Sequence, residues 1–444
     1  MRKLFSLLLV FVMLFSIFAC NDAPPAPNDG DTTNNGDTTN DGAGDSSSDN
    51  ESKVSTWDGT VATSFTVGNG SEAAPYEIQN AAEFAFFAKS VNDGESYARK
   101  YVTLGVDIDL ANLEWIPIGN GVNHFSGSFD GKGHSVLNLK TTTGAHYTAT
   151  LSGPELTYYA NGLFGTCLNP TIKNLNVNGA TVGLTNTNSS NMIVAGVLIG
   201  ILQADSAAQI SGITVSNAKV TSAFEKDHSP VSSLELGGLI GCLFATGESS
   251  VELSRLSVDV AVFTENGSGH AFDVGGFVGL VRSDNLLVVK DCALHLSVTL
   301  DPERCYGQNI SFAAFGVVSA MNEKVTLKNI FSRVTVNKIH DHFHGYSAYT
   351  ASAIVAEVTG MIQGNGGFHF ENLFGYVEQI DATGEKVVAT NLYDISSYVG
   401  VSTEQNCIGC VTLPENHGFD ETVWNLQDLA SPKLKNSNIL YERE

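Results

Sequence analysis

The sequence predicts an all-β solenoid of stacked repeats, closed at its N-terminal end by one amphipathic helix. Three observations support this prediction. A short Gly-hydrophobic-Gly motif recurs in tandem at nearly constant spacing. Only 16% of the residues are charged, against about 25% in a typical globular chain, and 44 residues are glycine. A single helical periodicity occurs, ahead of the repeats. This composition favours strands joined by tight turns.

The first twenty residues have the pattern of an export signal. Arg2 and Lys3 precede an apolar run that ends at Cys20. The run is shorter than the ~20 apolar residues that a transmembrane helix needs. Its last four residues, Ile-Phe-Ala-Cys, resemble the bacterial lipobox, in which the peptidase cuts before a lipidated Cys. We predict a lipoprotein signal peptide over residues 1–19 and lipidation of Cys20. An ordinary signal peptide, with Cys20 incidental, is the alternative.

Residues 20–56 have the composition of a tether. Gly-Asp-Thr-Thr-Asn occurs twice, large apolar residues are absent, and acids far outnumber Lys53. Such a segment buries too little apolar surface to fold, so we predict an acidic disordered linker behind the lipidated Cys. A calcium loop around Asp31 and Asp37 is disfavoured because the Glu at its twelfth position is missing. The anchor and linker predict an exported protein that is held to the cell envelope and exposed at the surface.

Residues 57–160 are predicted to form an N-terminal capping module. Apolar residues from Ala81 to Val91 recur at helical spacing, Asn80 is a good N-cap, and Glu83 occupies the capping-box position. Asn-Asp-Gly at 92–94 is expected to end this helix. Extended segments are expected to follow over residues 101–110, 115–118 and 136–139. A cap of this kind covers the open end of a repeat array.

The repeats occupy residues 161–400. The motif occurs at residues 162–165, 196–200, 237–241, 275–279 and, in weaker form, 315–319 and 352–356. Steps of 38, 40 and 37 residues separate the equivalent positions Leu239, Phe277, Val317 and Ile354. A second strand is predicted over residues 172–177, 210–215, 251–258, 289–296, 325–334 and 368–377. Units of this size are too small to be stable alone, so we expect each coil to stack on the last.

The repeat resembles the GLUG motif of bacterial surface proteins, named for its Gly-Leu-hydrophobic-Gly core. The preceding module resembles the one that often accompanies those repeats, through the motifs at residues 57–60, 75–78, 107–110, 115–119 and 129–134. Residues 401–444 are predicted to form a C-terminal capping segment, and 419–434 resemble the family's closing segment. The resemblance implies a single-stranded right-handed parallel β-helix at the cell surface, and little about activity. The fifth and sixth repeats depart by losing the second Gly.

Paired carboxylates would indicate a polysaccharide-cleaving enzyme. Such pairs lie ~5–5.5 Å apart in retaining enzymes and ~6.5–9.5 Å apart in inverting ones, and neighbouring coils are ~4.7–4.9 Å apart. In the predicted second strands, no two neighbouring coils both present an outward acid. Asp107, Asp109 and Asp130 lie in the capping module, where Asp beside Gly usually sets turns. We therefore expect no catalytic residue, and the enzymatic alternative rests on Asp259 or Glu378.

One outward row favours ligand binding. His295, Arg333 and Tyr376 are predicted to project side by side from three successive coils. Aromatic and polar side chains in such a column can bind sugars or peptides by stacking and hydrogen bonding. The alternative is an ordinary polar face in contact with solvent.

Metal and redox motifs are weak. His340, His342 and His344 would share one face of an extended strand and could ligate zinc or nickel, but they fall between the predicted strands. We expect no metal site and no cofactor. Besides Cys20 there are six cysteines, at 167, 242, 292, 305, 407 and 410. The first three are expected to pack as buried thiols. Cys407 and Cys410 have redox spacing without a βαβ context, so a local disulfide or two thiols are expected.

The net charge of −24 makes nucleic acid an unsuitable partner, because phosphate binding needs clusters of Lys and Arg. The membrane, through the lipid on Cys20, is the one partner that the motifs specify. The function we favour is binding or adhesion to an extracellular glycan or a host or matrix protein. The alternatives are an extracellular polysaccharide-cleaving enzyme of β-helix type and a structural spacer. The oligomeric state is left open.

Overall fold

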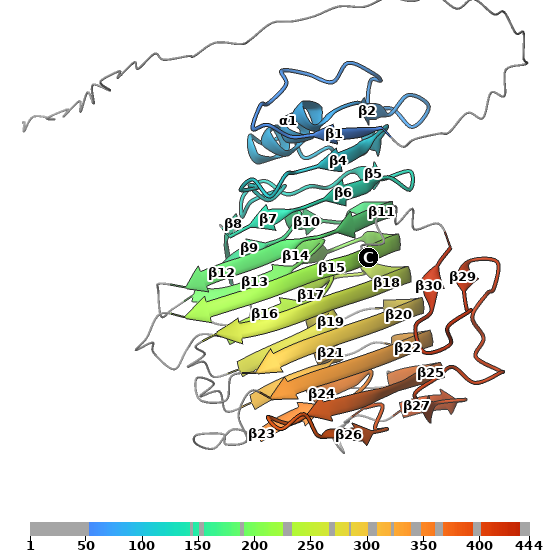
Figure 1. Cartoon of the computed structure of the whole chain (residues 1–444). Helices are drawn as coiled ribbons and strands as arrows, with labels where there is room; N and C mark the ends of the chain where they lie inside the picture. The colour runs from blue at the N-terminus through green and yellow to red at the C-terminus, as the bar shows by residue number, and fades with distance from the viewer. Residues whose placement is uncertain are drawn as a thin grey trace, which may run out of the picture. The chain divides into compact units, whose positions relative to one another are not determined.

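Parallel strands placed one above another build the fold. The computed structural model describes residues 53–142, 145–150, 155–186, 191–224, 233–265, 271–283, 286–300, 309–320, 324–338, 348–359, 367–393 and 401–435. These residues are nearly all β, with two large sheets of mostly parallel strands and one α-helix (Figure 1). The expectation of an all-β chain is confirmed. Within the described ranges, no helix is long and apolar enough to cross a membrane.

The larger sheet contains the predicted second strands. They are β11 (Thr171–Asn178), β15 (Ala207–Phe224), β18 (Ser250–Glu265), β20 (Leu286–Leu300), β22 (Lys324–Lys338) and β25 (Gly367–Ile380). Each pairs in parallel with the next, so that Leu175, Ile213 and Leu256 lie in one row. The row continues through Cys292, Ile330 and Leu373. Residues one repeat apart in sequence therefore become neighbours in space.

The smaller sheet contains the glycine motifs. Its parallel strands are β9 (Glu155–Asn161), β10 (Phe164–Leu168), β13 (Asn191–Gly196), β14 (Ile199–Ala204), β16 (Ser233–Gly237), β17 (Ile240–Ala245), β19 (Ala271–Ser283), β21 (Asn309–Ala320), β23 (Ala348–Ala351) and β24 (Val355–Thr359). Glycine is required where this sheet bends. A Cβ on Gly237 would lie 1.7 Å from the Ile240 carbonyl oxygen, and one on Gly275 would lie 1.7 Å from that of Val278.

The predicted alignment of the fifth repeat is wrong by three residues. Val317 pairs with Leu280, and Phe315 pairs with Val278, so Ala314 is the residue equivalent to Phe277. A Cβ on Gly316 would meet the Gly279 carbonyl oxygen at 2.5 Å. The fifth repeat has therefore kept the second glycine, and Ala313 has replaced the first.

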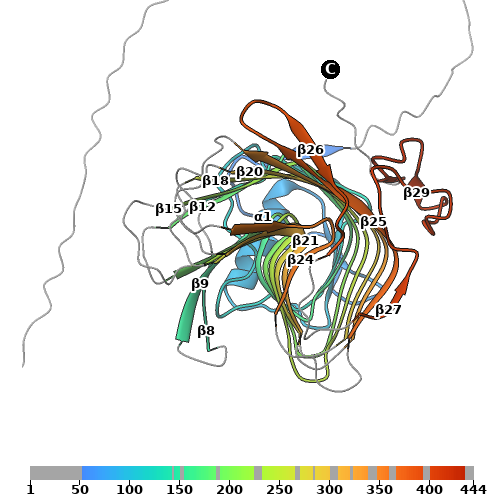
Figure 2. The ribbon, with the colours of Figure 1, turned by 90° about the horizontal axis from the view of Figure 1, so that it is seen from below.

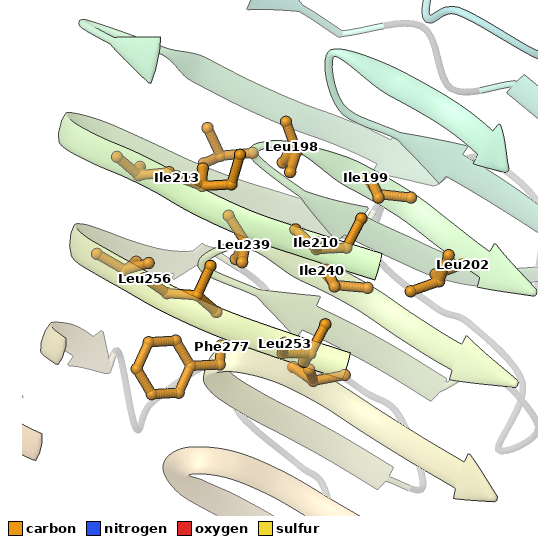
Figure 3. Packing of buried hydrophobic residues seen from close by; sticks show 14 of the residues in the cluster. Leu198, Ile199, Leu202, Ile210, Ile213, Leu239, Ile240, Leu253, Leu256 and Phe277 are labelled. Atoms are coloured by element: carbon orange, nitrogen blue, oxygen red, sulfur yellow. The ribbon is translucent and has the colours of Figure 1, made fainter. Parts of the chain in front are cut away.

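The hydrophobic core lies between the two sheets. Seen along the stack, the larger sheet curves around the smaller one and nearly closes a barrel (Figure 2). Inward side chains form rows that cross the coils, for example Leu198, Leu239 and Phe277, all fully buried (Figure 3). Burying one such side chain contributes about 1.5–3 kcal/mol. Each repeat thus covers apolar surface of the neighbouring repeats.

A corner of the larger sheet is held by a column of residues with left-handed backbone. Asp291, Asn329 and Asn372 all have φ between 51° and 57°. The Asn372 amide donates to Asn329 Oδ1 at 2.8 Å, and the Asn329 amide donates to Asp291 Oδ1 at 2.7 Å. Asn and Asp tolerate this conformation better than most residues. The column therefore combines a sharp turn with side-chain hydrogen bonds between coils.

The N-terminal module follows the prediction in its helix. α1 (Ala81–Asn92) begins at the N-cap Asn80, whose side chain accepts a hydrogen bond from the Glu83 amide at 2.9 Å. The Glu83 carboxylate accepts a hydrogen bond from the backbone amide of Gln79. In a standard capping box the donor would be the backbone amide of the N-cap residue, Asn80. Phe84 stacks on Trp115 at 5.1 Å between ring centroids, so α1 covers the first coils.

Short strands complete this module. They are β1 (Val54–Thr56), β2 (Tyr76–Ile78), β3 (Tyr101–Leu104), β4 (Asp107–Asp109), β5 (Ser128–Asp130), β6 (Ser135–Leu137), β7 (Lys140–Thr141) and β8 (Ala145–Thr150). β12 (Thr181–Asn186) follows β11 in the repeats and pairs with β7 and β15. The predicted linker is too long at its end, because β1 pairs with β4. The strand expected over 115–118 is absent, and Ile118 makes only an isolated bridge to Phe164. Pro117 lacks the amide hydrogen that a strand would use.

The C-terminal residues divide into two parts. β26 (Lys386–Ala389) pairs antiparallel with β25, while β27 (Val401–Gln405) and β28 (Ile408–Gly409) pair parallel with it. Residues 410–435, which we name the return segment, leave the sheet and carry β29 (Trp424–Asn425) and β30 (Lys433–Leu434), an antiparallel pair. Figure 2 shows β29 outside the stack, beside β25. The return segment thus lies along the outside of the larger sheet.

Candidate functional site: a groove on the larger sheet

The predicted row of outward side chains exists as a continuous column. Asp259 pairs with His295, His295 with Arg333, and Arg333 with Tyr376, each one coil further along. Because outward and inward side chains alternate along a strand, residues paired in register lie on the same face. The structure brings the three predicted residues together and adds Asp259 in front of them. The role of His295 and Arg333 in binding stays a prediction.

The return segment covers one end of this column. We name the outer cluster the buried apolar residues Ala293, Phe331, Phe374 and Tyr376 of the larger sheet and Leu413, Phe419, Trp424 and Leu434 of the return segment. Tyr376 is only 7% exposed. As a ligand-stacking residue, Tyr376 is therefore a wrong prediction, since it packs against the chain itself. Burial also raises the pKa of its hydroxyl.

Beyond the outer cluster, the column opens into a groove of about 950 Å³. Residues 430–433 of the return segment form one wall. Its other polar lining side chains include Asp109, Asn178, Ser216, Asp259, His295 and Arg333, which come from strands β4 to β22. The polar lining from Asp109 on β4 to Arg333 on β22 crosses seven strands, and six spacings of ~4.8 Å give it a length of about 29 Å. The groove therefore runs across the strands, along the direction of stacking.

The side chains of the groove are held by hydrogen bonds between coils. Asp259 Oδ1 lies 3.1 Å from His295 Nδ1. The Asn138 amide donates to Asp109 Oδ1 at 2.8 Å. The Asn217 amide donates to Asn178 Oδ1 at 3.0 Å. Groups fixed in this way lose little entropy when a ligand binds, which favours affinity.

Arg333 is bound to an acid beside the groove. Its Nη2 donates to Glu378 Oε2 at 3.0 Å, and Lys386 Nζ lies 2.9 Å from Glu378 Oε1. The hydrogen bond from Lys386, together with that from Arg333, lowers the pKa of Glu378 below its usual value. The Arg333 guanidinium also lies 5.9 Å from the centre of the Tyr376 ring.

The two acids of the enzymatic alternative do not form a pair. Glu378 lies in the coil of Tyr376, three coils from Asp259, a separation of at least about 14 Å. That exceeds the ~9.5 Å limit of an inverting pair. Of the module acids, Asp109 and Asp130 accept hydrogen bonds from the turn amides of Ala111 and Lys132.

A different carboxylate pair escaped the sequence reasoning. Glu235 and Asp273 are paired in register on neighbouring strands of the smaller sheet and are 3% and 6% exposed. Both lie close enough to raise the pKa of the buried Cys242 thiol, although burial is the larger cause. Glu235 and Asp273 each stand two residues before a Gly-Gly pair, at 237–238 and 275–276. An alignment of the repeats on these glycines would therefore have predicted that the two acids are neighbours.

The return segment was the other omission. Sequence reasoning placed residues 401–444 at the end of the stack, and so missed Lys433 and the wall that it belongs to. The alternating Trp424 and Leu426, with Leu434, were a signal that this segment has an apolar side to bury.

Several predicted sites lie outside the described residues. They are Cys20 with the signal and most of the linker, Cys305, and His340, His342 and His344. Within the described ranges, no group of three or more His, Cys, Asp or Glu could hold a metal ion. Cys167, Cys242 and Cys292 are buried free thiols whose pKa values burial raises. Cys407 and Cys410 are free thiols as well.

Comparison with known proteins gives slight similarities. No family model matches the chain. Halomucin of Haloquadratum walsbyi is 28% identical over 160 residues, which cover 32% of this chain and 2% of Halomucin. The chain therefore spans a small fraction of that relative. A crystal structure of a candidate immunoglobulin A1 protease from Bacteroides ovatus has 17% sequence identity and a TM-score of 0.40, and covers 84% of this chain and 96% of that one. A TM-score this low indicates neither fold nor activity.

Proposed function

We propose that the chain is a surface-exposed binding protein that holds an extended extracellular glycan in the groove of the larger sheet. The groove is the observation that carries this proposal. Its length of about 29 Å suits a linear polymer better than a small molecule. Amides and hydroxyls such as those of Asn178 and Ser216 can hydrogen-bond to sugar hydroxyls.

The scaffold in this proposal is a right-handed parallel β-helix of the GLUG type. Parallel pairing between successive repeats supports it, because each of these repeats adds one strand to the larger sheet. Parallel strands joined by a crossover are right-handed in ~98% of cases. A stacked scaffold is rigid, and it repeats polar positions at the spacing of the coils. Such a surface is suited to a ligand that also repeats along its length.

Attachment to the cell envelope belongs to the same proposal. The apolar run ending at Cys20 and the acidic tether behind it support export and lipidation. A tether of this length would let the groove reach ligands away from the membrane. Mass spectrometry of the mature protein tests this part directly, since lipidation adds diacylglycerol to Cys20. An unmodified Cys20, or cleavage at another residue, would contradict it.

An array of glycans and matrix proteins tests the function. We expect the purified full chain to bind one glycan class saturably and to release no product in the same wells. Ser216→Trp should abolish binding of a chain that lies along the groove, because the indole would block the groove near its middle. The matched control is Gln209→Trp, on the same strand and exposed but outside the groove. Binding only to proteins, release of oligosaccharides, or equal effects of the two variants would contradict the proposal.

A further inference from the structure

We infer that the groove selects a neutral glycan chain that carries a carboxylate at one end. This inference rests on the proposed function and adds the chemical class and orientation of the ligand. It follows from the unequal distribution of charge along the groove.

Cations gather in the half of the groove nearer β22. Arg333 of β22 and His295 of β20 line the groove there, and Lys433 of β30 reaches it beside β18, which β30 contacts. In a chain with 23 Lys and Arg against 47 Asp and Glu, this is an uncommon concentration of positive charge. Lys433 is exposed and has no ion-pair partner among the described residues. The one carboxylate bound to Arg333, that of Glu378, is shared with Lys386. The group of Arg333, Glu378 and Lys386 therefore keeps a net positive charge.

Arg333 has hydrogen-bonding capacity left. Among the described residues, its Nη2 donates to Glu378, and its Nε is buried without a hydrogen-bond partner. The side chain is 35% exposed, so part of the guanidinium remains accessible from the groove. A guanidinium binds carboxylates through two parallel hydrogen bonds, whereas an ammonium acts as a point charge. A ligand carboxylate at Arg333 would use this capacity, and Lys433, nearer β18, would attract it over a longer distance.

The rest of the groove disfavours a ligand with many charges. Asn138, Asn178 and Ser216 provide neutral polar groups, and Asp109 stands at the far end. Asp259, in the middle, is bound to His295. A polymer with an acid on every unit would bring carboxylates beside Asp109 and Asp259, which repel them. One terminal acid, followed by neutral sugars, fits the whole length.

Calorimetric titration of the full chain with three oligosaccharide probes tests the inference. The probes are a neutral hexasaccharide of three N-acetyllactosamine units, the same chain carrying one terminal sialic acid, and a hexamer of galacturonate. We expect the sialylated chain to bind at least about tenfold more tightly than the neutral one, as one charge-assisted hydrogen bond implies. This advantage should shrink as salt is raised. The galacturonate hexamer should bind most weakly.

Three variants locate the effect. Arg333→Lys should remove most of the advantage, although it keeps the positive charge that Glu378 needs. Lys433→Gln should reduce the advantage by a smaller amount, because Lys433 lies nearer β18. Lys328→Gln is the matched control, because Lys328 lies on β22, outside the groove, in an ion pair with Glu371 at 2.8 Å. It should leave the advantage unchanged.

The outcomes separate the two proposals. Equal affinity for the neutral and sialylated chains, both blocked by Ser216→Trp, would overturn the inference and leave the proposed function standing. If the control Lys328→Gln lost as much of the preference for the sialylated chain as Arg333→Lys, the inference would also be overturned, because the preference would then depend on the overall charge of the protein. Tighter binding of an acidic peptide than of any glycan would overturn the inferred ligand class. Failure of all three probes, together with an empty array, would overturn both proposals.

Discussion

Trp424 holds the return segment against the larger sheet. Its ring is 1% exposed and packs edge-on against Phe419, with centroids 5.3 Å apart. Its indole N–H is buried without a hydrogen-bond partner among the described residues. Truncating a buried Trp to Ala costs about 3–5 kcal/mol. An unsatisfied buried N–H costs about 1–3 kcal/mol. Trp424→Phe removes that N–H and keeps most of the ring, so it should cost no more than ~1 kcal/mol.

Hydrogen exchange measures this cost where it arises. The amides of Leu413 and Lys435 are bonded within the return segment, to Leu429 and Val423. If Trp424→Ala releases the segment alone, 3–5 kcal/mol corresponds to roughly a hundred- to several thousand-fold faster exchange at these amides. Amides in β15 and β18 should keep their protection. Unchanged exchange in the segment, equal loss in β15 and β18, or equal effects of the Ala and Phe variants would refute the reasoning.

Three further predictions follow from the described contacts. Glu378→Gln should destabilise the fold by about 1–3 kcal/mol at pH 7. The folded-state pKa of Glu378 lies below 4.5, so the stability difference between the wild type and Glu378→Gln should shrink as the pH falls through that lowered pKa. A stability difference that does not change with pH in denaturation experiments would contradict this prediction. Asn329→Leu should lower the free energy of unfolding by about 2–4 kcal/mol in chemical denaturation, because it strains the left-handed backbone and loses the side-chain hydrogen bonds. Asn329→Gly should lower it less, because glycine adopts this backbone without strain. Equal losses for the two variants would count against the role of the corner column. Iodoacetamide should label Cys407 and Cys410 before Cys292, because burial keeps the Cys292 thiol protonated. Mass spectrometry of the peptides measures the order of labelling. Early labelling of Cys292 would contradict its burial.

Much of the fold could be predicted because local pattern and long-range packing agree. The alternation of apolar residues around Val258 places one face of each strand in the core, and α1 carries its own start and stop signals. The register failed where the motif had decayed. The prediction matched Gly316 to Gly276, the glycine next to the first glycine of the motif. In the structure Gly316 lies against Gly279, the last glycine of the motif. Backbone contact with Gly279, which no pattern encodes, decides the alignment.

The candidate site was half predictable for a related reason. The repeat spacing placed His295 beside Arg333, because register follows from periodicity. Nothing in the spacing indicates that residues 410–435 turn back, since that depends on apolar surface left on the outside of the sheet. Phe331 and Phe374 provide that surface. Each stands two residues before a predicted outward residue, so alternation along the strand places both outward, but no pattern shows which segment covers them. The return segment then buries Tyr376 and creates a groove wall.

Binding of a chain-length series tests the central claim most directly. The full chain would be titrated with sialylated N-acetyllactosamine chains of increasing length, with Ser216→Trp as the blocked control. If the ligand lies along the stacked coils, the affinity should rise with each added unit until the chain fills the groove, and then level off. Affinity that is independent of length, or that survives Ser216→Trp, would contradict the account.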